Sequence, residues 1–191
     1  MSGRVDPVAH LRELAETATR SADVLAEQIR AATQMVRETV QGGGTLFFCG
    51  NGGSAADAQH IATEYVVRYM RTRRPLRAIA LTTDTSLLTA AANDFSFDEV
   101  FSRQVEALGR AGDLLVLHTT SGNSPNCLRA VEAAKVLGVK TLALTAKDGG
   151  KIRGMVDLCL VVPTERTDRA QEIHMAIQHG ICDAVDEEVA R

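Results

Sequence analysis

The sequence predicts an α/β fold in which a parallel sheet lies between layers of helices. Short, almost continuously apolar stretches recur along the chain, as expected for strands that are buried on both faces. Segments with helical spacing of apolar residues lie between these stretches, and 191 residues suffice for one compact domain. Because strands alternate with helices, the connections are crossovers, which set neighbouring strands parallel to one another.

The elements follow from these patterns in chain order. The first forty residues form a helical segment, in which apolar residues from Val24 to Val40 recur at helical spacing until Gly42–Gly44 ends the run. We expect strands at Thr45–Cys49, Ala78–Leu81, Leu114–Leu117, Thr141–Leu144 and Leu158–Val162. We expect the later helices at Ser54–Met70, Thr85–Ala92, Asp98–Leu108, Ser124–Leu137 and Asp168–Val189. The N-terminal segment has no strand of its own, so we expect it to pack against another subunit.

Composition excludes several classes of protein. A net charge of −3 argues against binding nucleic acid by bulk phosphate neutralisation, although a local basic patch stays open. An aromatic content of 4% without tryptophan argues against a base-stacking platform. The N-terminus lacks a signal-peptide core, and no apolar run approaches the ~20 residues of a membrane span. We therefore expect a soluble cytoplasmic protein, whose four scattered cysteines are mostly buried, reduced thiols.

A glycine-rich turn follows the first predicted strand. Gly50–Ser54 lets the backbone approach a ligand closely, and the helix N-terminus that follows favours a phosphate or sugar hydroxyls. Ser54 and Asp57 fit a capping box. The turn also fits a loose dinucleotide fingerprint, but no acidic residue follows at the ~20-residue spacing that ribose recognition needs. A tight turn without a ligand is the alternative.

His60 and Glu64 lie four residues apart in the following predicted helix. At that spacing they share one helix face, about 6 Å apart along the axis. The pair suits two ligands of one metal, or a base beside a hydrogen-bond partner. An ordinary surface pair is the alternative, and the nearby glycine-rich turn favours a site.

A hydroxyl-rich turn follows the third predicted strand. It comprises Thr119, Thr120, Ser121, Gly122 and Ser124, with Pro125 at the first helical position. Backbone N–H groups and hydroxyls of such a turn can bind a phosphate without a lysine. We therefore expect phosphate binding here, whereas packing at the strand end explains the adjacent His118 equally well.

The last predicted helix carries amide and imidazole side chains on a largely apolar background. Gln171, Glu172, His174, Gln178 and His179 would need partners if buried. Gln171 and His179 are eight residues apart, or about 12 Å along a helix axis. They meet at one site only if they reach towards each other or if the helix starts after Gln171. A core histidine is the simpler interpretation.

Taken together, the turns resemble the phosphoheptose isomerases, which are sugar isomerase (SIS) domain proteins. The resemblance rests on the motifs Gly50–His60, Thr119–Ser124 and Gln171–His174, and Asn93-Asp94-Phe95 and Phe101–Gln104 also fit. It covers nearly the whole chain. It implies the SIS fold, a flavodoxin-like three-layer sandwich with a five-stranded parallel sheet. The chain would be a single SIS domain over residues 1–191, with residues 1–42 used in oligomerisation, in a homotetramer with sites at subunit interfaces.

The resemblance also implies a reaction and its residues. The reaction converts D-sedoheptulose 7-phosphate to D-glycero-D-manno-heptose 7-phosphate through an enediol, the first step of ADP-heptose biosynthesis for lipopolysaccharide or other glycans. One zinc per subunit would be held by His60, Glu64, Gln171 and His179. Glu64 would be the base and His179 the acid, with the reverse assignment as the alternative. Substrate contacts would be Asn51, Gly52, Gly53, Ser54, Glu64, Asn93, Asp94, Thr119, Thr120, Ser121, Ser124 and Gln171.

Two other functions stay open on these motifs. Similar SIS proteins bind the replication initiator without catalysis, and the arginines at 68, 71, 73, 74 and 77 could serve such a partner or simply form a solvated turn. An isomerase of another sugar phosphate is the second alternative, although such enzymes typically lack the paired His60/Glu64 and Gln171/His179 arrangement. Many phosphoheptose isomerases carry Ser-Thr-Ser where this chain has Thr119-Thr120-Ser121. Threonine at residue 119 keeps the hydroxyl group that serine has there.

Overall fold

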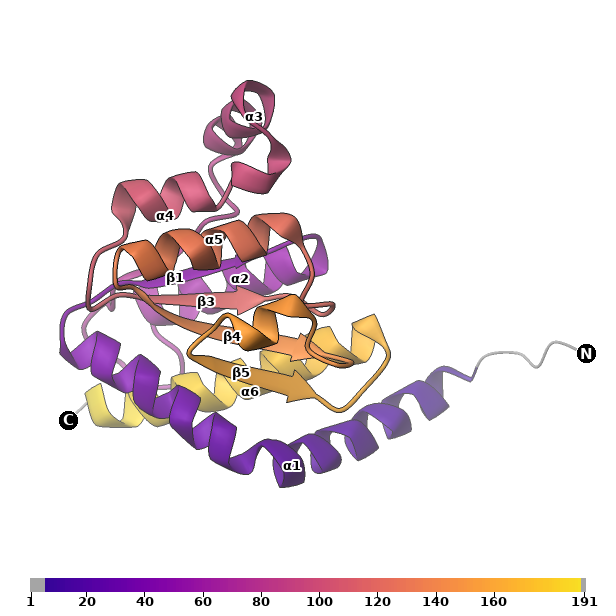
Figure 1. Ribbon diagram of the computed structural model, residues 1–191. Helices are drawn as coiled ribbons and strands as arrows, with labels where there is room; N and C mark the ends of the chain where they lie inside the picture. The colour runs from indigo at the N-terminus through magenta and orange to yellow at the C-terminus, as the bar shows by residue number, and fades with distance from the viewer. Residues whose placement is uncertain (1–5, 190–191) are drawn as a thin grey trace, which may run out of the picture.

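A computed structural model describes residues 6–189 and has the predicted three-layer α/β architecture. Five parallel strands form one sheet in the order β2-β1-β3-β4-β5 (Figure 1). The strands are β1 Leu46–Gly50, β2 Ala78–Ala80, β3 Leu114–His118, β4 Lys140–Ala146 and β5 Leu158–Val162. All five predicted strands are therefore confirmed, with ends that differ by at most two residues.

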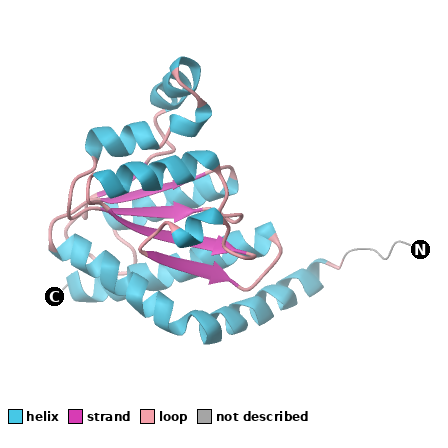
Figure 2. Cartoon of the chain, viewed as in Figure 1, coloured by secondary structure: helices cyan, strands magenta, loops and turns pink. Residues whose placement is uncertain are grey.

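Helices cover both faces of this sheet (Figure 2). One face packs against α1 (Pro7–Gln41), α2 (Gly53–Val66) and α6 (Thr167–Val189). The other packs against α4 (Ser102–Leu108) and α5 (Pro125–Val136), while α3 (Thr85–Asp94) projects beyond them. Two short 3-10 helices, Phe97–Glu99 and Lys151–Gly154, complete the described elements.

Alternate residues of the central strands enter two separate cores. Phe48 and Val116 pack with α1, α2 and α6, whereas Phe47 and Leu115 pack under α4 and α5. All four are at most 1% exposed. Burial on both faces explains why these strands read as continuous apolar runs in the sequence.

Two of the later predicted helices differ from the structure by more than two residues. The helix expected to reach Met70 ends at Val66, because the backbone N–H groups of residues 69–71 donate to the Asp186 carboxylate instead of continuing the helix. The helix expected over residues 98–108 is divided into Phe97–Glu99 and α4. There the Ser102 hydroxyl bonds both the backbone and the carboxylate of Glu99.

The long helix α1 begins at Pro7, where the Asp6 side chain accepts a hydrogen bond from the backbone of Val8. Its inner face packs on β5 and α6, and its outer face leaves Leu11 and Val24 exposed. Oligomerisation through residues 1–42 stays a prediction, and residues 1–5 and 190–191 of the predicted domain lie outside the described residues. Within residues 6–189, no helix has the length and apolar character to cross a membrane.

Candidate active site

The carboxyl ends of β1 and β3 lie next to each other and lead into the two turns singled out in the sequence. Asn51, after β1, and Asn126, in the first turn of α5, exchange two amide hydrogen bonds of 2.9 Å. Gly52 follows with φ +58°, a left-handed conformation that favours glycine. The paired amides therefore hold the β1 turn against the helix that follows β3.

Gln171 of α6 lies over the start of α2. Its Nε2 atom lies 3.5 Å from Ser54 Oγ, and a Cβ placed on Gly53 would come within 2.6 Å of the same nitrogen. A side chain larger than hydrogen at residue 53 would thus displace Gln171. The structure brings Gly53, Ser54 and Gln171 together, three of the predicted substrate contacts.

The predicted capping box at α2 is wrong. The N-cap of α2 is Gly52, whose conformation requires glycine, so Ser54 lies inside the first turn and makes no capping bond. Asp57 Oδ2 is buried and has no hydrogen-bond partner among the described residues. Burial raises the pKa of Asp57 to about 6, an effect that nearby His60 opposes.

The turn after β3 presents the predicted hydroxyls. Thr119 Oγ1 is buried without a hydrogen-bond partner in the described part of the chain, while Thr120 and Ser121 are half-buried. Ser124 occupies the N-cap of α5 with Pro125 after it, as predicted, but its hydroxyl makes no capping bond. These hydroxyls and the α5 N-terminus are therefore available to an anion.

His60, Glu64 and His179 converge where α2 meets α6. One ligand atom from each side chain lies within 4.8 Å of the other two. The two Nε2 atoms of the histidines are 3.1 Å apart, and Glu64 Oε1 lies 3.4 Å from His60 Nε2. Such a cluster could hold a metal ion, since imidazole nitrogens and carboxylate oxygens are common ligands of divalent metals.

His179 is supported by a contact that the sequence did not indicate. The Tyr69 ring stacks on the imidazole, with centroids 5.3 Å apart and planes at 11°. Partial burial lowers the pKa of His179, and His60 adds to this, whereas Glu64 opposes it. The neutral ring, which is the form that binds metal, is therefore favoured.

Two predicted associations are not seen in the described chain: Gln171 does not lie with the triad, and Asn93 and Asp94 lie apart from both clusters. Gln171 and His179 are eight residues apart in the continuous helix α6, because α6 starts at Thr167, before Gln171. Asn93 and Asp94 are exposed at the end of α3 and hydrogen-bond to each other at 2.8 Å. A pocket of about 130 Å³ at the β1 turn is lined by Asn51, Gly52 and Phe97. Asn93 and Asp94 do not line it.

Two further histidines are core residues, as the sequence favoured for His174 and allowed equally for His118. His118 and His174 are fully buried. His174 Nε2 donates to the Thr145 carbonyl at 3.1 Å, and His118 Nε2 lies 3.1 Å from the Gln178 amide nitrogen. These bonds pin α6 to β3 and β4 beneath the turns. The cysteines also follow expectation, because Cys49, Cys127 and Cys182 are buried, Cys159 is half-buried and all four are free thiols.

Acid should destabilise the fold between about pH 6.5 and pH 5. Burial lowers the pKa of His118 to about 3, with nearby His174 adding to the effect, and burial lowers the pKa of His174 to about 4. The unfolded chain binds these protons near pH 6.5, so each histidine reduces the free energy of unfolding by about 2 kcal/mol at pH 5.

Urea unfolding at pH 7.5 and pH 5.0 measures this loss. His174→Gln, whose amide can still donate to Thr145, should remove about half of it. An equal pH dependence in the variant and the parent would contradict the assignment of the loss to these rings.

Two of the five arginines at 68, 71, 73, 74 and 77 form ion pairs, whereas Arg68, Arg74 and Arg77 are exposed. The Arg73 side chain is 1% exposed and pairs with Asp186 at 2.6 Å, while Arg71 pairs with Asp183 at 2.6 Å. The interpretation as a solvated turn is therefore wrong for Arg73. Sequence reasoning missed both the Arg73–Asp186 pair and Tyr69, because 113 residues separate the charged partners and no local pattern joins them.

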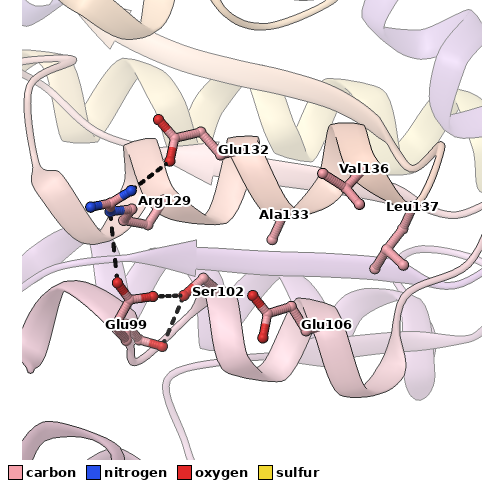
Figure 3. Close-up of a pocket in the computed structure, with 8 residues that line it drawn as sticks. All are labelled: Glu99, Ser102, Glu106, Arg129, Glu132, Ala133, Val136 and Leu137. Atoms are coloured by element: carbon pink, nitrogen blue, oxygen red, sulfur yellow. Dashed lines mark hydrogen bonds and ion pairs between the residues drawn. The ribbon is translucent and has the colours of Figure 1, made fainter. Parts of the chain in front are cut away.

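A separate pocket lies between α4 and α5, away from the predicted site residues (Figure 3). It measures about 260 Å³ and is lined by the charged Glu99, Glu106, Arg129 and Glu132 and by the apolar Ala133, Val136 and Leu137. Arg129 bonds Glu132 across one helical turn and approaches Glu99 of the facing segment. None of the predicted catalytic, metal or substrate residues lines it.

Comparison with known proteins identifies relatives across the chain. Residues 9–146 match the family described as SIS domain. Phosphoheptose isomerases from Chlorobaculum parvum and Aliarcobacter butzleri are 55% and 49% identical to this chain. The first alignment covers 93% of this chain and 84% of the relative, and the second covers 92% and 93%.

Solved structures agree with these relatives. The phosphoheptose isomerase from Neisseria gonorrhoeae superposes with a TM-score of 0.89 at 46% identity, covering 94% of this chain and 96% of that one. The enzyme from Francisella tularensis gives 0.90 at 36% identity, with coverage of 94% and 95%. The chain belongs to the phosphoheptose isomerases of the SIS-domain family.

Proposed function

We propose that this protein is an aldose–ketose isomerase that converts D-sedoheptulose 7-phosphate to D-glycero-D-manno-heptose 7-phosphate, the first step of ADP-heptose biosynthesis. The observation that carries the proposal is the convergence of His60, Glu64 and His179 on α2 and α6. Family membership supports the same reaction, because this chain aligns with phosphoheptose isomerases over almost their whole length.

The phosphate end of the substrate would bind at the turn after β3. The hydroxyls of Thr119, Thr120, Ser121 and Ser124 make few bonds to protein there, and the N-terminus of α5 favours an anion. The β1 turn, with Asn51, Gly52, Gly53 and Ser54, lies beside it and would contact the sugar hydroxyls.

The isomerisation moves one proton between C1 and C2 through an enediol. We assign Glu64 as the base that removes the proton from C1 of the ketose and returns it to C2. His179 would donate a proton to the C2 oxygen and accept one from the C1 oxygen, so atoms and charge balance. Its closeness to Glu64 in the cluster supports this division of roles.

The triad fits a zinc ion. Bonds of about 2.0–2.1 Å to a tetrahedral zinc place neighbouring ligand atoms about 3.3 Å apart, close to the separations of 3.1 and 3.4 Å found here. When bound, zinc would polarise the substrate carbonyl or orient its hydroxyl groups. Gln171, the proposed fourth ligand, lies against Gly53 and Ser54, so it reaches the triad only if its side chain turns towards His179. Otherwise it serves as a substrate contact.

A homotetramer with sites at subunit interfaces accounts for the residues that one chain leaves apart. Asn93 and Asp94, proposed to contact substrate, lie on the projecting helix α3, and Phe95 and Phe97 beside them are 60% and 59% exposed. A neighbouring copy that covers these rings would place its own α3 beside the site of this chain, or would have the α3 of this chain beside its own site. Light scattering of the purified protein measures the mass directly.

Turnover tests the proposal. Purified protein should isomerise sedoheptulose 7-phosphate when loaded with zinc, and metal stripping should slow the reaction at least about tenfold, with zinc restoring it. A panel of pentose and hexose phosphates is the specificity control. Turnover of another sugar phosphate but not of the heptulose would overturn the substrate assignment.

A further inference from the structure

The Arg73 guanidinium caps the C-terminal end of α2. Its terminal nitrogens donate to the backbone carbonyls of Glu64 at 2.7 Å and Tyr65 at 2.8 Å. These carbonyls belong to the last turn of α2, where the helix itself offers no N–H partner. The Arg73 side chain is 1% exposed, so water does not replace these bonds.

Asp186 of α6 completes the arrangement. Its Oδ1 atom accepts from Arg73 Nε at 2.6 Å. Its Oδ2 atom accepts from the backbone N–H groups of Tyr69, Met70 and Arg71 at 3.0–3.2 Å. One buried carboxylate therefore holds both the arginine and the backbone that follows α2.

These bonds connect the two helices that carry the triad. Glu64, which supplies a carbonyl to Arg73, also supplies a carboxylate to the triad. Asp186 lies seven residues after His179 on α6, about two turns away on the same helix face. Tyr69, whose N–H is bound to Asp186, stacks on the His179 ring.

We propose that the Arg73–Asp186 pair is a positioning device that sets Glu64 and His179 at the separation a metal ion requires. The inference rests on the metal site of the proposed function. Stability does not by itself require such a pair, because a buried ion pair is often replaced by apolar side chains without loss of stability. What an apolar pair cannot supply is the planar fork that reaches Asp186 and two carbonyls at once.

Arg73→Lys tests the proposal, because lysine keeps the charge beside Asp186 but its single terminal nitrogen cannot reproduce a planar fork of three separate nitrogens. The matched control is Arg71→Lys, which alters the exposed pair with Asp183 between the same segment and the same helix. Zinc affinity is measured on the full chain by competition with a chromogenic chelator, alongside thermal unfolding of the metal-free protein. Arg73→Lys should weaken zinc binding at least about tenfold, as loss of a supporting contact around metal ligands typically does, and Arg71→Lys should change it less than twofold.

The outcomes separate this inference from the proposed function. Zinc binding by Arg73→Lys within twofold of the parent overturns the inference alone, whether or not thermal stability falls. A parent that binds no zinc overturns the metal site, and the inference with it.

Hydrogen exchange of the unaltered protein gives a second measurement that does not depend on a variant folding. Zinc should slow exchange of the amides at 69–71 at least about fivefold more than that of the β3 amides at 115–117. Equal slowing at the two segments would overturn the inference.

Discussion

Replacing Glu64 by glutamine should reduce kcat for sedoheptulose 7-phosphate at least about 100-fold, the lower end of what a positioned general base contributes. The amide keeps the shape of the side chain but cannot accept the C1 proton. The fold should survive, because the Glu64 side chain is 22% exposed and its ionic partner, His60, is 50% exposed. Because the pair is only partly exposed and the amide can still hydrogen-bond, its loss should change the free energy of unfolding by about 1 kcal/mol.

The experiment must separate the base from the metal ligand, since Glu64 is proposed as both. Turnover is therefore measured at saturating zinc, with bound zinc determined on the same sample. A variant that is loaded with zinc but inactive supports the base assignment. Near-normal turnover of the loaded variant would contradict it. Glu132→Gln, which alters an exposed carboxylate at the distant pocket between α4 and α5, is the control and should retain activity.

Local patterns were sufficient to predict most of the fold. β3 was predicted at Leu114–Leu117 and spans Leu114–His118, because a strand that lies between two others and is buried on both faces forms a short continuous apolar run. The end of α2 was not predictable in this way. It depends on the Asp186 carboxylate, which lies 115 to 117 residues away in sequence from the N–H groups it binds.

In the candidate site, too, local spacing predicts some features, whereas contacts between distant parts of the chain set the others. His60 and Glu64 were paired from their spacing, since four residues along a helix set a distance whatever the fold. His179 joins them because of the way α6 packs against α2, and helical spacing alone does not predict how two helices pack. Spacing also predicted that Gln171 would not easily share a metal ion with His179, because eight residues within one helix keep the two about two turns apart.

Replacing Gly122 by alanine should lower the free energy of unfolding by about 3 kcal/mol, through strain at a left-handed residue and a clash of backbone. Gly122 has φ +64°, and a Cβ there would overlap the carbonyl of Gly149, itself in a left-handed turn with Gly150. Ile152 also donates its N–H to the Gly122 carbonyl, so both sides of the contact are fixed. For a chain of this length the midpoint of thermal unfolding should fall by about 10 °C.

The same substitution should weaken the proposed phosphate site, because Gly122 ends the turn that presents Thr119, Thr120 and Ser121. We expect the KM for the sugar phosphate to rise at least about tenfold at temperatures where the variant is folded, since a displaced turn loses hydrogen bonds to a charged group. Gly154→Ala is the matched control, because its Cβ would meet no atom within 4 Å and its backbone is not left-handed. An unchanged KM in a stably folded Gly122→Ala protein would place the phosphate elsewhere, even if the loss of stability were as large as expected.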